Sequence, residues 1–353
     1  MVLRKKIIVA GHICLDITPA FPAGSARSLA EVLSPGKLVQ VAGVDLHTGG
    51  AVANTGLAMK FFGADVRLLG KIGDDEFGQI ILGLLKRYGY DGDQDMIVSH
   101  RSPTSYSVVL ALPGVDRIFL HNPGANDTFC YEDLDFGTMQ GAEHFHFGYP
   151  PLMRKIYAED GDELVKIFEA AKKFGLATSL DMAAVDPASD AGKADWRKIL
   201  ERVLPFVDFF MPSVEELCFM LDRERYESWN ERAEGSDITG VIDIEREVKP
   251  LAKELEKMGA TGILIKCGSL GLYYKTADKE GFKESYKPQK VVSGTGAGDI
   301  SIAAFLVSML SGKSLERSVE LMAAAGATCV ESYDALSGLK SLEELEDKID
   351  SGW

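Results

Sequence analysis

The chain has 353 residues, of which 46% are hydrophobic and 26% charged, and its net charge is −15. This composition is that of an ordinary globular protein, and the length suits one large domain with an appendage. The negative charge argues against a nucleic-acid partner, because a phosphate backbone would be repelled. No apolar run reaches the roughly 20 residues that a membrane-spanning helix needs, so no membrane partner is expected.

The cysteines and the N-terminus indicate the compartment. Five cysteines are spread along the chain without a CxxC pair. Such an odd, dispersed set argues against a disulfide framework or a zinc ribbon and favours a reducing, cytoplasmic setting. The basic residues before the first apolar run resemble a signal peptide, but Gly11 interrupts the run and Asp16 follows soon after. We therefore interpret this run as a buried strand.

The first third of the chain predicts a strand followed by a small β unit. Lys6 to Ala10 is a continuous, β-branched run typical of a buried parallel strand. Residues 12–48 are rich in proline and glycine and predict short strands and loops outside the main sheet. Residues 104–120 predict a hairpin, with a turn at Pro113-Gly114 and a second strand from Arg117 to His121. We expect this hairpin to pair with residues 12–48.

The rest of the chain alternates between helical and strand patterns, except for a charged, weakly patterned stretch at 221–243 that we interpret as a surface excursion. This alternation predicts an α/β fold, in which helices cover both faces of a doubly wound, mostly parallel sheet. Helices are expected over residues 49–62, 77–88, 163–174, 196–204 and 245–258, and strands over 65–69, 177–181, 206–211 and 262–266.

Two structural units follow from these patterns. Residues 1–11, 49–98 and 121–353 are expected to form a large α/β domain, and residues 12–48 and 99–120 a small β lid. Exposed strands in such a lid could pair with those of a second copy, which suggests a homodimer through the lid.

A glycine-dense turn, Ser293-Gly294-Thr295-Gly296-Ala297-Gly298-Asp299, leads into an apolar helix. Glycines permit close approach of the backbone to a ligand, and the first amides of a helix attract an anion. Asp299 could accept the proton of an alcohol while these amides stabilise charge on a moving phosphoryl group. Taken alone, the turn is equally compatible with a helix cap that binds no ligand.

Two signatures together resemble the PfkB/ribokinase family of carbohydrate and nucleoside kinases over nearly the whole chain. The first is Gly49-Gly50-Ala51-Val52-Ala53-Asn54-Thr55-Gly56-Leu57-Ala58, continuing through residues 62–64 and 69–78. The second is the turn Gly296-Ala297-Gly298-Asp299. The resemblance implies a ribokinase-like fold, with a doubly wound α/β domain and a small β lid over a sugar.

The resemblance also implies roles for residues at matching positions. The catalytic group is Asp299 as base, with an anion hole formed by Gly296, Ala297 and Gly298. The substrate positions are Asp16, Gly49, Gly50, Asn54, Asn126 and Tyr149. The nucleotide positions are Lys266, Gly268, Gly271, Thr295 and Ser213, with Glu216 at the magnesium position. The residue types agree, since glycines let a polyol approach the backbone and Asp and Asn hydrogen-bond hydroxyls.

Some positions depart from the family pattern. Ser293-Gly294 stands where many members have Asp-Thr, and in several relatives that aspartate belongs to a monovalent-cation site. Dependence on a monovalent cation is therefore doubtful. Ser213 replaces the asparagine of an Asn-x-x-Glu motif whose glutamate Glu216 keeps, and Lys266 stands where a threonine is usual. ATP and Mg²⁺ remain the expected cofactors.

Two further groups of polar residues allow more than one interpretation. His144 and His146 alternate with phenylalanines and so share one face of a strand, where metal binding, a structural role and substrate contact all remain open. Asp181 and Asp186 follow the end of another strand. Either carboxylate could approach the phosphates through magnesium or cap a loop.

The resulting hypothesis is an ATP-dependent kinase that phosphorylates a hydroxyl, in particular a hydroxymethyl group, of a small sugar or polyol. Two alternatives stay open. One is a nucleoside kinase of the same fold, with which Phe147 and Tyr149 are compatible. The other is a non-catalytic sugar-binding or regulatory protein, which the departures at Ser293 and Ser213 motivate.

Overall fold

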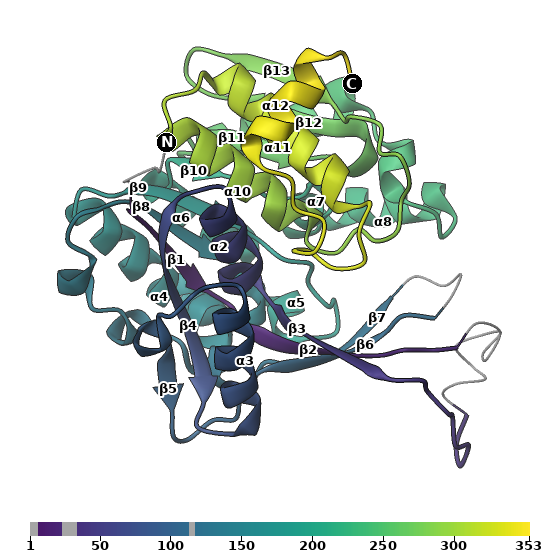
Figure 1. Ribbon diagram of the computed structural model, residues 1–353. Helices are drawn as coiled ribbons and strands as arrows, with labels where there is room; N and C mark the ends of the chain where they lie inside the picture. Colours follow the sequence, from purple (N-terminus) through teal and green to yellow (C-terminus); the bar gives the residue numbers. More distant parts are fainter. Residues whose placement is uncertain (1–5, 23–33, 113–116) are drawn as a thin grey trace.

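The computed structural model describes residues 6–22, 34–112 and 117–353, which form two sheets of unequal size (Figure 1). The larger sheet has nine strands in the order β13-β12-β11-β10-β9-β8-β1-β4-β5. These strands are β1 (Lys6–Gly11), β4 (Asp65–Gly73), β5 (Ile97–Ser99), β8 (Ala142–Gly148), β9 (Ala177–Asp181), β10 (Phe209–Phe210), β11 (Ile263–Lys266), β12 (Gly271–Lys275) and β13 (Glu280–Glu284).

The large sheet is mostly parallel, which confirms the predicted fold class. All neighbours from β11 to β5 run parallel, and β12 and β13 continue the sheet in antiparallel fashion. The β12–β13 hairpin was not predicted. Its edge strand β13 alternates exposed and half-buried residues and carries charges, so it lacks the apolar run that marks a buried strand.

Helices cover both faces of the sheet. Strand β1 shows the consequence, because Ile8 and Ala10 pack into one hydrophobic cluster while Ile7 and Val9 pack into the other, and all four are fully buried. One face is covered by α2 (Ala51–Phe61), α3 (Glu76–Arg87), α10 (Ala297–Leu310), α11 (Leu315–Cys329) and α12 (Leu342–Asp350). The other is covered by α4 (Arg154–Lys173), α6 (Trp196–Val203), α7 (Val214–Leu221) and α9 (Lys249–Lys257). A short helix, α5, spans Asp190–Lys193.

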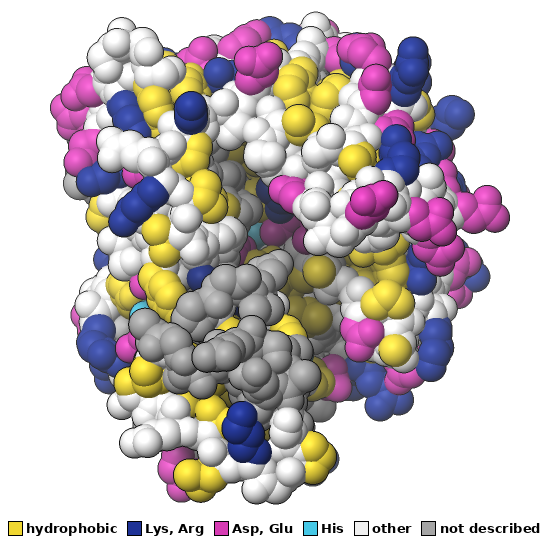
Figure 2. Space-filling view, turned by 90° about the vertical axis from the view of Figure 1, so that its right-hand side faces the viewer, with side chains coloured by type: hydrophobic (Ala, Val, Ile, Leu, Met, Phe, Trp, Pro, Cys, Tyr) yellow, Lys and Arg dark blue, Asp and Glu magenta, His cyan; other side chains and the backbone are white. Residues whose placement is uncertain are grey.

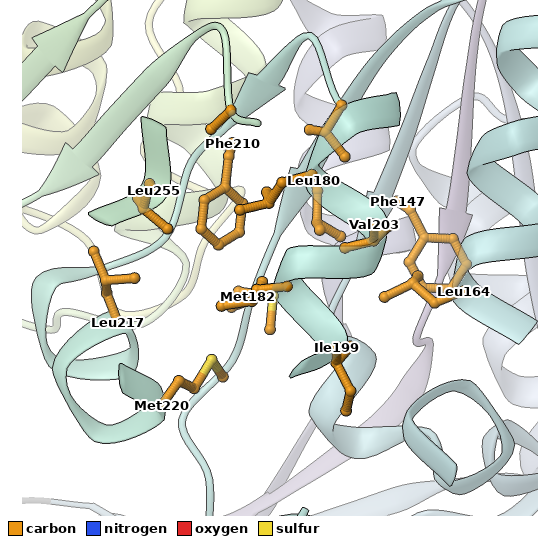
Figure 3. Packing of buried hydrophobic residues seen from close by; sticks show 14 of the residues in the cluster. Phe147, Leu164, Leu180, Met182, Ile199, Val203, Phe210, Leu217, Met220 and Leu255 are labelled. Carbon is orange, nitrogen blue, oxygen red and sulfur yellow. The ribbon is translucent and has the colours of Figure 1, made fainter. Parts of the chain in front are cut away.

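Figure 3 shows the packing of the hydrophobic cluster that contains Ile8 and Ala10, between the sheet and helices α4, α6, α7 and α9. Phe147 and Leu180 project from neighbouring strands of the sheet toward Val203 of α6. Leu217 of α7 and Leu255 of α9 close the cluster beside them. Because both faces are filled in this way, functional side chains are expected at the ends of the strands, in the loops and at the helix ends that meet there.

The stretch at 221–243 lies largely at the surface, as expected, but it is more regular than its weak pattern suggested. It contains helix α8, Arg223–Ala233, in which Trp229 is fully buried and donates from Nε1 to Glu247 Oε1 at 2.7 Å. Apart from Trp229, Ala233 and the partly buried Tyr226 the helix is polar, so its apolar face is too narrow to give a helical pattern.

The small sheet, which we expect to act as a lid and call the lid below, extends away from the body in Figure 1. It consists of β2 (Cys14–Pro19), β3 (Val44–Gly49), β6 (Tyr106–Leu110) and β7 (Ile118–Asn122), in the order β3-β2-β6-β7. The predicted pairing of the hairpin with the 12–48 segment is thereby confirmed, while the Pro113-Gly114 turn lies outside the described residues.

Two predictions about larger organisation remain predictions. The predicted boundary between the α/β domain and the lid at residues 98/99 falls within β5, which pairs with β4 in the large sheet. The division of the chain into these two units stays a prediction. The lid exposes Val44, Phe119 and Leu120, and pairing of two lids in a homodimer stays a prediction. Within the described residues, none of the helices combines the length and apolarity that crossing a membrane requires.

Candidate functional site

The glycine turn places free backbone amides at the start of α10. Gly296 is the N-cap residue, with a φ of 77° that favours glycine. Ile300 donates the first regular helical bond to the Gly296 carbonyl at 2.9 Å, and the Ala297 amide bonds Gly294 at 3.2 Å. The amides of Gly298 and Asp299 therefore precede the regular bonding pattern and can receive an anion.

Asp299 lies in the first turn of α10, and its side chain is held by three neutral donors. The Tyr149 hydroxyl donates to Oδ2 at 2.8 Å, and Asn54 Nδ2 donates to the same oxygen at 3.0 Å. The Thr55 hydroxyl donates to Oδ1 at 3.0 Å. Asn54 and Thr55 lie on α2, which is packed against α10, and Tyr149 follows strand β8 in a left-handed conformation with a φ of 67°.

The electrostatics of this carboxylate suit a base. Burial raises the pKa of Asp299 above its ordinary value, although the hydrogen bonds from Tyr149 and Asn54 and the charge of Lys266 offset part of this effect. A raised pKa makes the carboxylate a stronger proton acceptor near neutral pH. Burial and the Asp299 charge raise the pKa of Tyr149 well above its usual range, so its hydroxyl stays protonated and donates.

A pocket that is open to solvent lies between the lid and the segment that follows α11. The face that carries the lid is hollowed at its centre, with acidic, basic and histidine side chains at the bottom of the hollow (Figure 2). Asp16 lines the pocket, and burial raises its pKa to about 6. The remaining lining residues are Thr18, His47, Thr48, Asn54, Val109, Arg117, Phe119, Thr295, Tyr333, Asp334 and Ala335.

The two glycines before α2 bring the predicted substrate residues together. A Cβ atom on Gly49 would lie 2.7 Å from Oδ1 of Asp16, so only glycine leaves room for that carboxylate. Gly50 has a φ of 86°, and a Cβ atom there would lie 2.5 Å from the carbonyl oxygen of His12. Asp16 and Asn54 thus line one pocket, Asn54 is bonded to Asp299, and the glycine pair lies against Asp16 and His12.

Asn126 differs from the other predicted substrate residues. It is fully buried, its Nδ2 donates to the Ile13 carbonyl at 2.8 Å, and its Oδ1 accepts from the Ile13 amide at 3.3 Å. Both functions of the amide are therefore occupied by the backbone, which favours a structural role that fixes the start of the lid.

On the other side of Asp299, Lys266 lies next to the anion-binding turn. Its Nζ would be 3.3 Å from a Cβ atom on Gly298, and it donates to Asp181 Oδ1 at 2.6 Å. Glu216 and Ser213 form a capping box at the start of α7, in which Glu216 Oε2 accepts from the Ser213 amide at 2.7 Å. The serine that departs from the family motif thus has a defined structural role.

The remaining nucleotide-side positions have clear backbone functions. Gly268 lies between β11 and β12 and Gly271 begins β12, with φ values of 53° and 131°, both in the region that favours glycine. The Thr295 amide donates to Ser293 Oγ at 3.0 Å, and its hydroxyl accepts a hydrogen bond from Arg117. A nucleotide contact at Gly268, Gly271 or Thr295 stays a prediction.

The histidine pair points to a structural role among the alternatives left open. His144 and His146 both hydrogen-bond Ser179 Oγ, at 2.7 and 2.8 Å. Burial lowers the pKa of His144 to about 4 and that of His146 to about 3, so both rings are neutral.

Sequence reasoning missed several residues of the site. Thr55 was inside a recognised signature, but its bond to Asp299 depends on how α2 faces α10. Arg117 of the lid bonds Thr295 and the carbonyl of Tyr333 at 3.2 Å, and it stacks over the Tyr333 ring. Tyr333 and Asp334 belong to a loop whose sequence carries no motif.

Comparison with known proteins places this arrangement in context. A family model described as pfkB family carbohydrate kinase matches residues 6–342. An uncharacterized sugar kinase of Archaeoglobus fulgidus is 28% identical, over 80% of this chain and 98% of its own length. The 2-dehydro-3-deoxygluconokinase of Bacillus subtilis is 26% identical, over 88% of this chain and 89% of its own length. The solved structure of Arabidopsis thaliana ribokinase, complexed with ribose and ATP, shares the fold with a TM-score of 0.72 at 20% identity, covering 98% of each chain.

Proposed function

Because this chain belongs to the pfkB family of carbohydrate kinases, we propose that it transfers the γ-phosphoryl group of ATP to a hydroxyl of a small sugar or polyol, with Asp299 as the general base. A hydroxymethyl group is the expected acceptor, because a primary alcohol can reach most easily into a pocket whose base is buried. The free cysteines, all five of them buried, support a reducing compartment such as the cytoplasm.

The observation that carries the proposal is the position of one carboxylate. Asp299 lies in the first turn of α10 and is hydrogen-bonded to Asn54, which lines the open pocket, and its pKa is raised by burial. An alcohol in the pocket could donate its proton to this carboxylate while the amides face the phosphoryl group. A protein that only bound sugar would have no use for a base at this place, which argues against the non-catalytic alternative.

The chemistry follows from these positions. The acceptor hydroxyl takes over the hydrogen bond that the Tyr149 hydroxyl or Asn54 makes with Asp299 Oδ2. As the acceptor oxygen attacks the γ-phosphorus, Asp299 removes its proton, and the bond from phosphorus to the bridging oxygen of ADP breaks. The amides of Gly298 and Asp299 stabilise the charge on the moving group.

The residues present fit magnesium. Asp181, Glu216 and Asp299 are near enough to influence one another's charge, and carboxylate oxygens are the ligands that Mg²⁺ prefers. No group of closely spaced ligand atoms includes Glu216 in the described part of the chain, as expected for an ion held by one or two carboxylates together with nucleotide phosphates. Glu216 would hold the ion, which neutralises phosphate charge when bound. The changed residues at Ser293-Gly294 do not support a monovalent-cation site.

A nucleoside kinase is the second candidate, and the pocket lining favours keeping it. Phe119 and Tyr333 are aromatic side chains at the wall of the pocket, where a nucleobase could stack. Asp16 and the glycine pair would contact the hydroxyls of either a free sugar or a ribose.

An assay of ADP formation separates the candidates. The purified protein is given Mg·ATP and, in separate reactions, neutral sugars, sugar acids, nucleosides or no acceptor. We expect ADP formation that depends on a sugar or polyol, with the phosphate found on a hydroxymethyl group of the product. Stimulation by nucleosides alone would support the second candidate. ADP formation with none of the acceptors, despite measurable sugar binding, would support a non-catalytic protein.

A further inference from the structure

Lys266 and Asp181 form a buried ion pair at an edge of the large sheet. Lys266 ends β11 with 12% of its side chain exposed, and Asp181 ends β9 with 2% exposed. Both residues lie at the carboxyl ends of parallel strands, where open α/β sheets bind ligands. Burial of two opposite charges contributes little net stability, because desolvation offsets their attraction. The position of the Lys266–Asp181 pair at this edge therefore suggests that the pair serves to bind a ligand rather than to stabilise the fold.

The charges that face Lys266 come from several elements. Burial by itself would lower the pKa of Lys266, but the carboxylates of Asp181 on β9, Glu216 on α7 and Asp299 on α10 outweigh this and raise it. His146 on β8 also faces Lys266 and is neutral, because burial lowers its pKa to about 3. Lys266 is thus a charged ammonium among three carboxylates, in a region that must admit a polyanion.

The ammonium also lies beside the N-terminus of α10. Its Nζ would be 3.3 Å from a Cβ atom on Gly298, so Lys266 lies directly beside the turn whose amides can receive an anion. An ammonium has three N–H donors, and the hydrogen bonds within the described residues use one of them, to Asp181. The other donors can reach the oxygens of an anion.

We propose that Lys266 is a catalytic residue that contacts the phosphoryl group in transfer, and that Asp181 is the positioning residue that holds its ammonium beside α10. The inference rests on the proposed kinase function and adds the group that neutralises the transition state. The acceptor oxygen forms its bond to the γ-phosphorus, the bond to ADP breaks, and the acceptor proton passes to Asp299. Lys266 keeps its own proton throughout and stabilises the charge on the moving oxygens.

A second buried pair of the same sheet provides a matched control. Lys71 on β4 lies 2.7 Å from Asp133, with 11% of its side chain exposed, and is outside the residues of the proposed site. Lys266→Met and Lys71→Met each remove the charged partner of a carboxylate that is buried or half-buried, so both should lower Tm. Only Lys266→Met should also lower kcat, by about 100-fold or more, the usual effect of losing one donor to transition-state charge. Lys266→Arg should restore part of the rate.

Nucleotide affinity provides a readout that does not depend on turnover. In calorimetric titrations with Mg·ATP and Mg·ADP, Lys266→Met should weaken ATP binding about tenfold more than ADP binding, because only ATP carries the γ-phosphoryl group. Lys71→Met should leave the ratio of the two affinities unchanged. For Asp181 as a positioning residue, the effects of Asp181→Asn and Lys266→Met on kcat should be strongly non-additive in the double variant.

The outcomes distinguish a failure of the proposed Lys266 role from a failure of the proposed kinase function. If the wild-type protein transfers phosphate while Lys266→Met keeps both kcat and the affinity ratio within about twofold, the pair is structural and the proposal is wrong. If Lys266→Met does not fold, kcat and the ratio of ATP to ADP affinity are measured for Lys266→Arg and Asp181→Asn instead. If neither variant changes kcat or this ratio, the proposal for Lys266 is wrong. A wild-type protein that phosphorylates no acceptor overturns the kinase function itself.

Discussion

At the scale of single residues, the key feature is a carboxylate that is buried yet fully hydrogen-bonded. Asp299 receives bonds from Tyr149, Asn54 and Thr55, which fix both of its oxygens. Burial raises its pKa and these donors lower it, so its basicity is set by the balance of the two effects. The Tyr149 hydroxyl has the geometry that an acceptor hydroxyl needs, and it can mark the place of the acceptor when the pocket is empty.

This balance predicts a pH effect for Tyr149→Phe. The Tyr149 hydrogen bond lowers the pKa of Asp299, so its removal should raise that pKa further. The base must be ionised to accept a proton, and the acidic limb of the kcat/KM profile, which reports the free enzyme, should therefore move to higher pH. The measurement is kcat/KM for the acceptor from about pH 5 to 9, the range in which a raised carboxyl pKa is visible.

Tyr90→Phe serves as the control for this prediction. Tyr90 also donates to a carboxylate, Asp95 Oδ2 at 2.8 Å, but it lies outside the proposed site. Its removal should lower stability and leave the pH profile in place. A Tyr149→Phe profile with an unmoved acidic limb, or one moved to lower pH, would show that this carboxylate is not the base.

Some residues of the candidate site could be predicted from the sequence and others could not. Asp299, Gly49, Gly50 and Asn54 could be identified because each stands in a short motif with a physical meaning. The partnership of Lys266 with Asp181 could not, because it depends on two strands that flank β10 and end at the same edge. Lys266 alone was a departure from a family pattern, and Asp181 alone was compatible with a loop cap.

At the scale of elements, predictions held where a continuous apolar pattern was present. Strand β9 spans Ala177–Asp181 as expected, and β1 and α6 differ from their predicted ranges only at their ends. Strand β10 is shorter than expected, at Phe209–Phe210, and α9 is preceded by a π-helical turn over Ile244–Val248. Elements with few apolar residues, such as α8 and β13, were missed because single anchors give no periodicity.

The anchor of α8 can be tested by truncation. Trp229→Ala removes a fully buried indole and leaves Glu247 without its Nε1–H donor, so it should lower the free energy of unfolding by about 3–5 kcal/mol. Urea denaturation followed by circular dichroism measures this loss. Trp353→Ala, which removes a half-buried indole stacked on Tyr286, should cost much less. Equal losses in the two variants would contradict the anchoring role of Trp229.

At the scale of the whole molecule, the lid and the body meet at Arg117. This residue directly precedes β7, the second strand of the lid hairpin, and bonds both Thr295 of the catalytic turn and the Tyr333 carbonyl. The pocket lies between these parts, so Arg117 holds together the walls that surround the acceptor. Exclusion of water matters here, because water competes with the acceptor for the phosphoryl group.

Arg117→Ala should therefore loosen this closure. We expect a higher KM for the acceptor and more ATP hydrolysis for each acceptor that is phosphorylated. The ratio of ADP formed to phosphorylated product measures this directly, and it should rise above the wild-type value. Arg101→Ala, which removes an exposed arginine, should leave the ratio unchanged. A wild-type ratio in Arg117→Ala would mean that the contact does not control access of water.

The central claim is that Asp299 takes the proton of the acceptor at the end of the glycine turn. The most direct measurement is single-turnover phosphoryl transfer by Asp299→Asn, with ATP affinity determined on the same preparation. Loss of a general base predicts a rate lowered by about 10²–10⁴-fold while ATP binds nearly as tightly as to the wild type. An Asp299→Asn variant that keeps most of its transfer rate would contradict the claim.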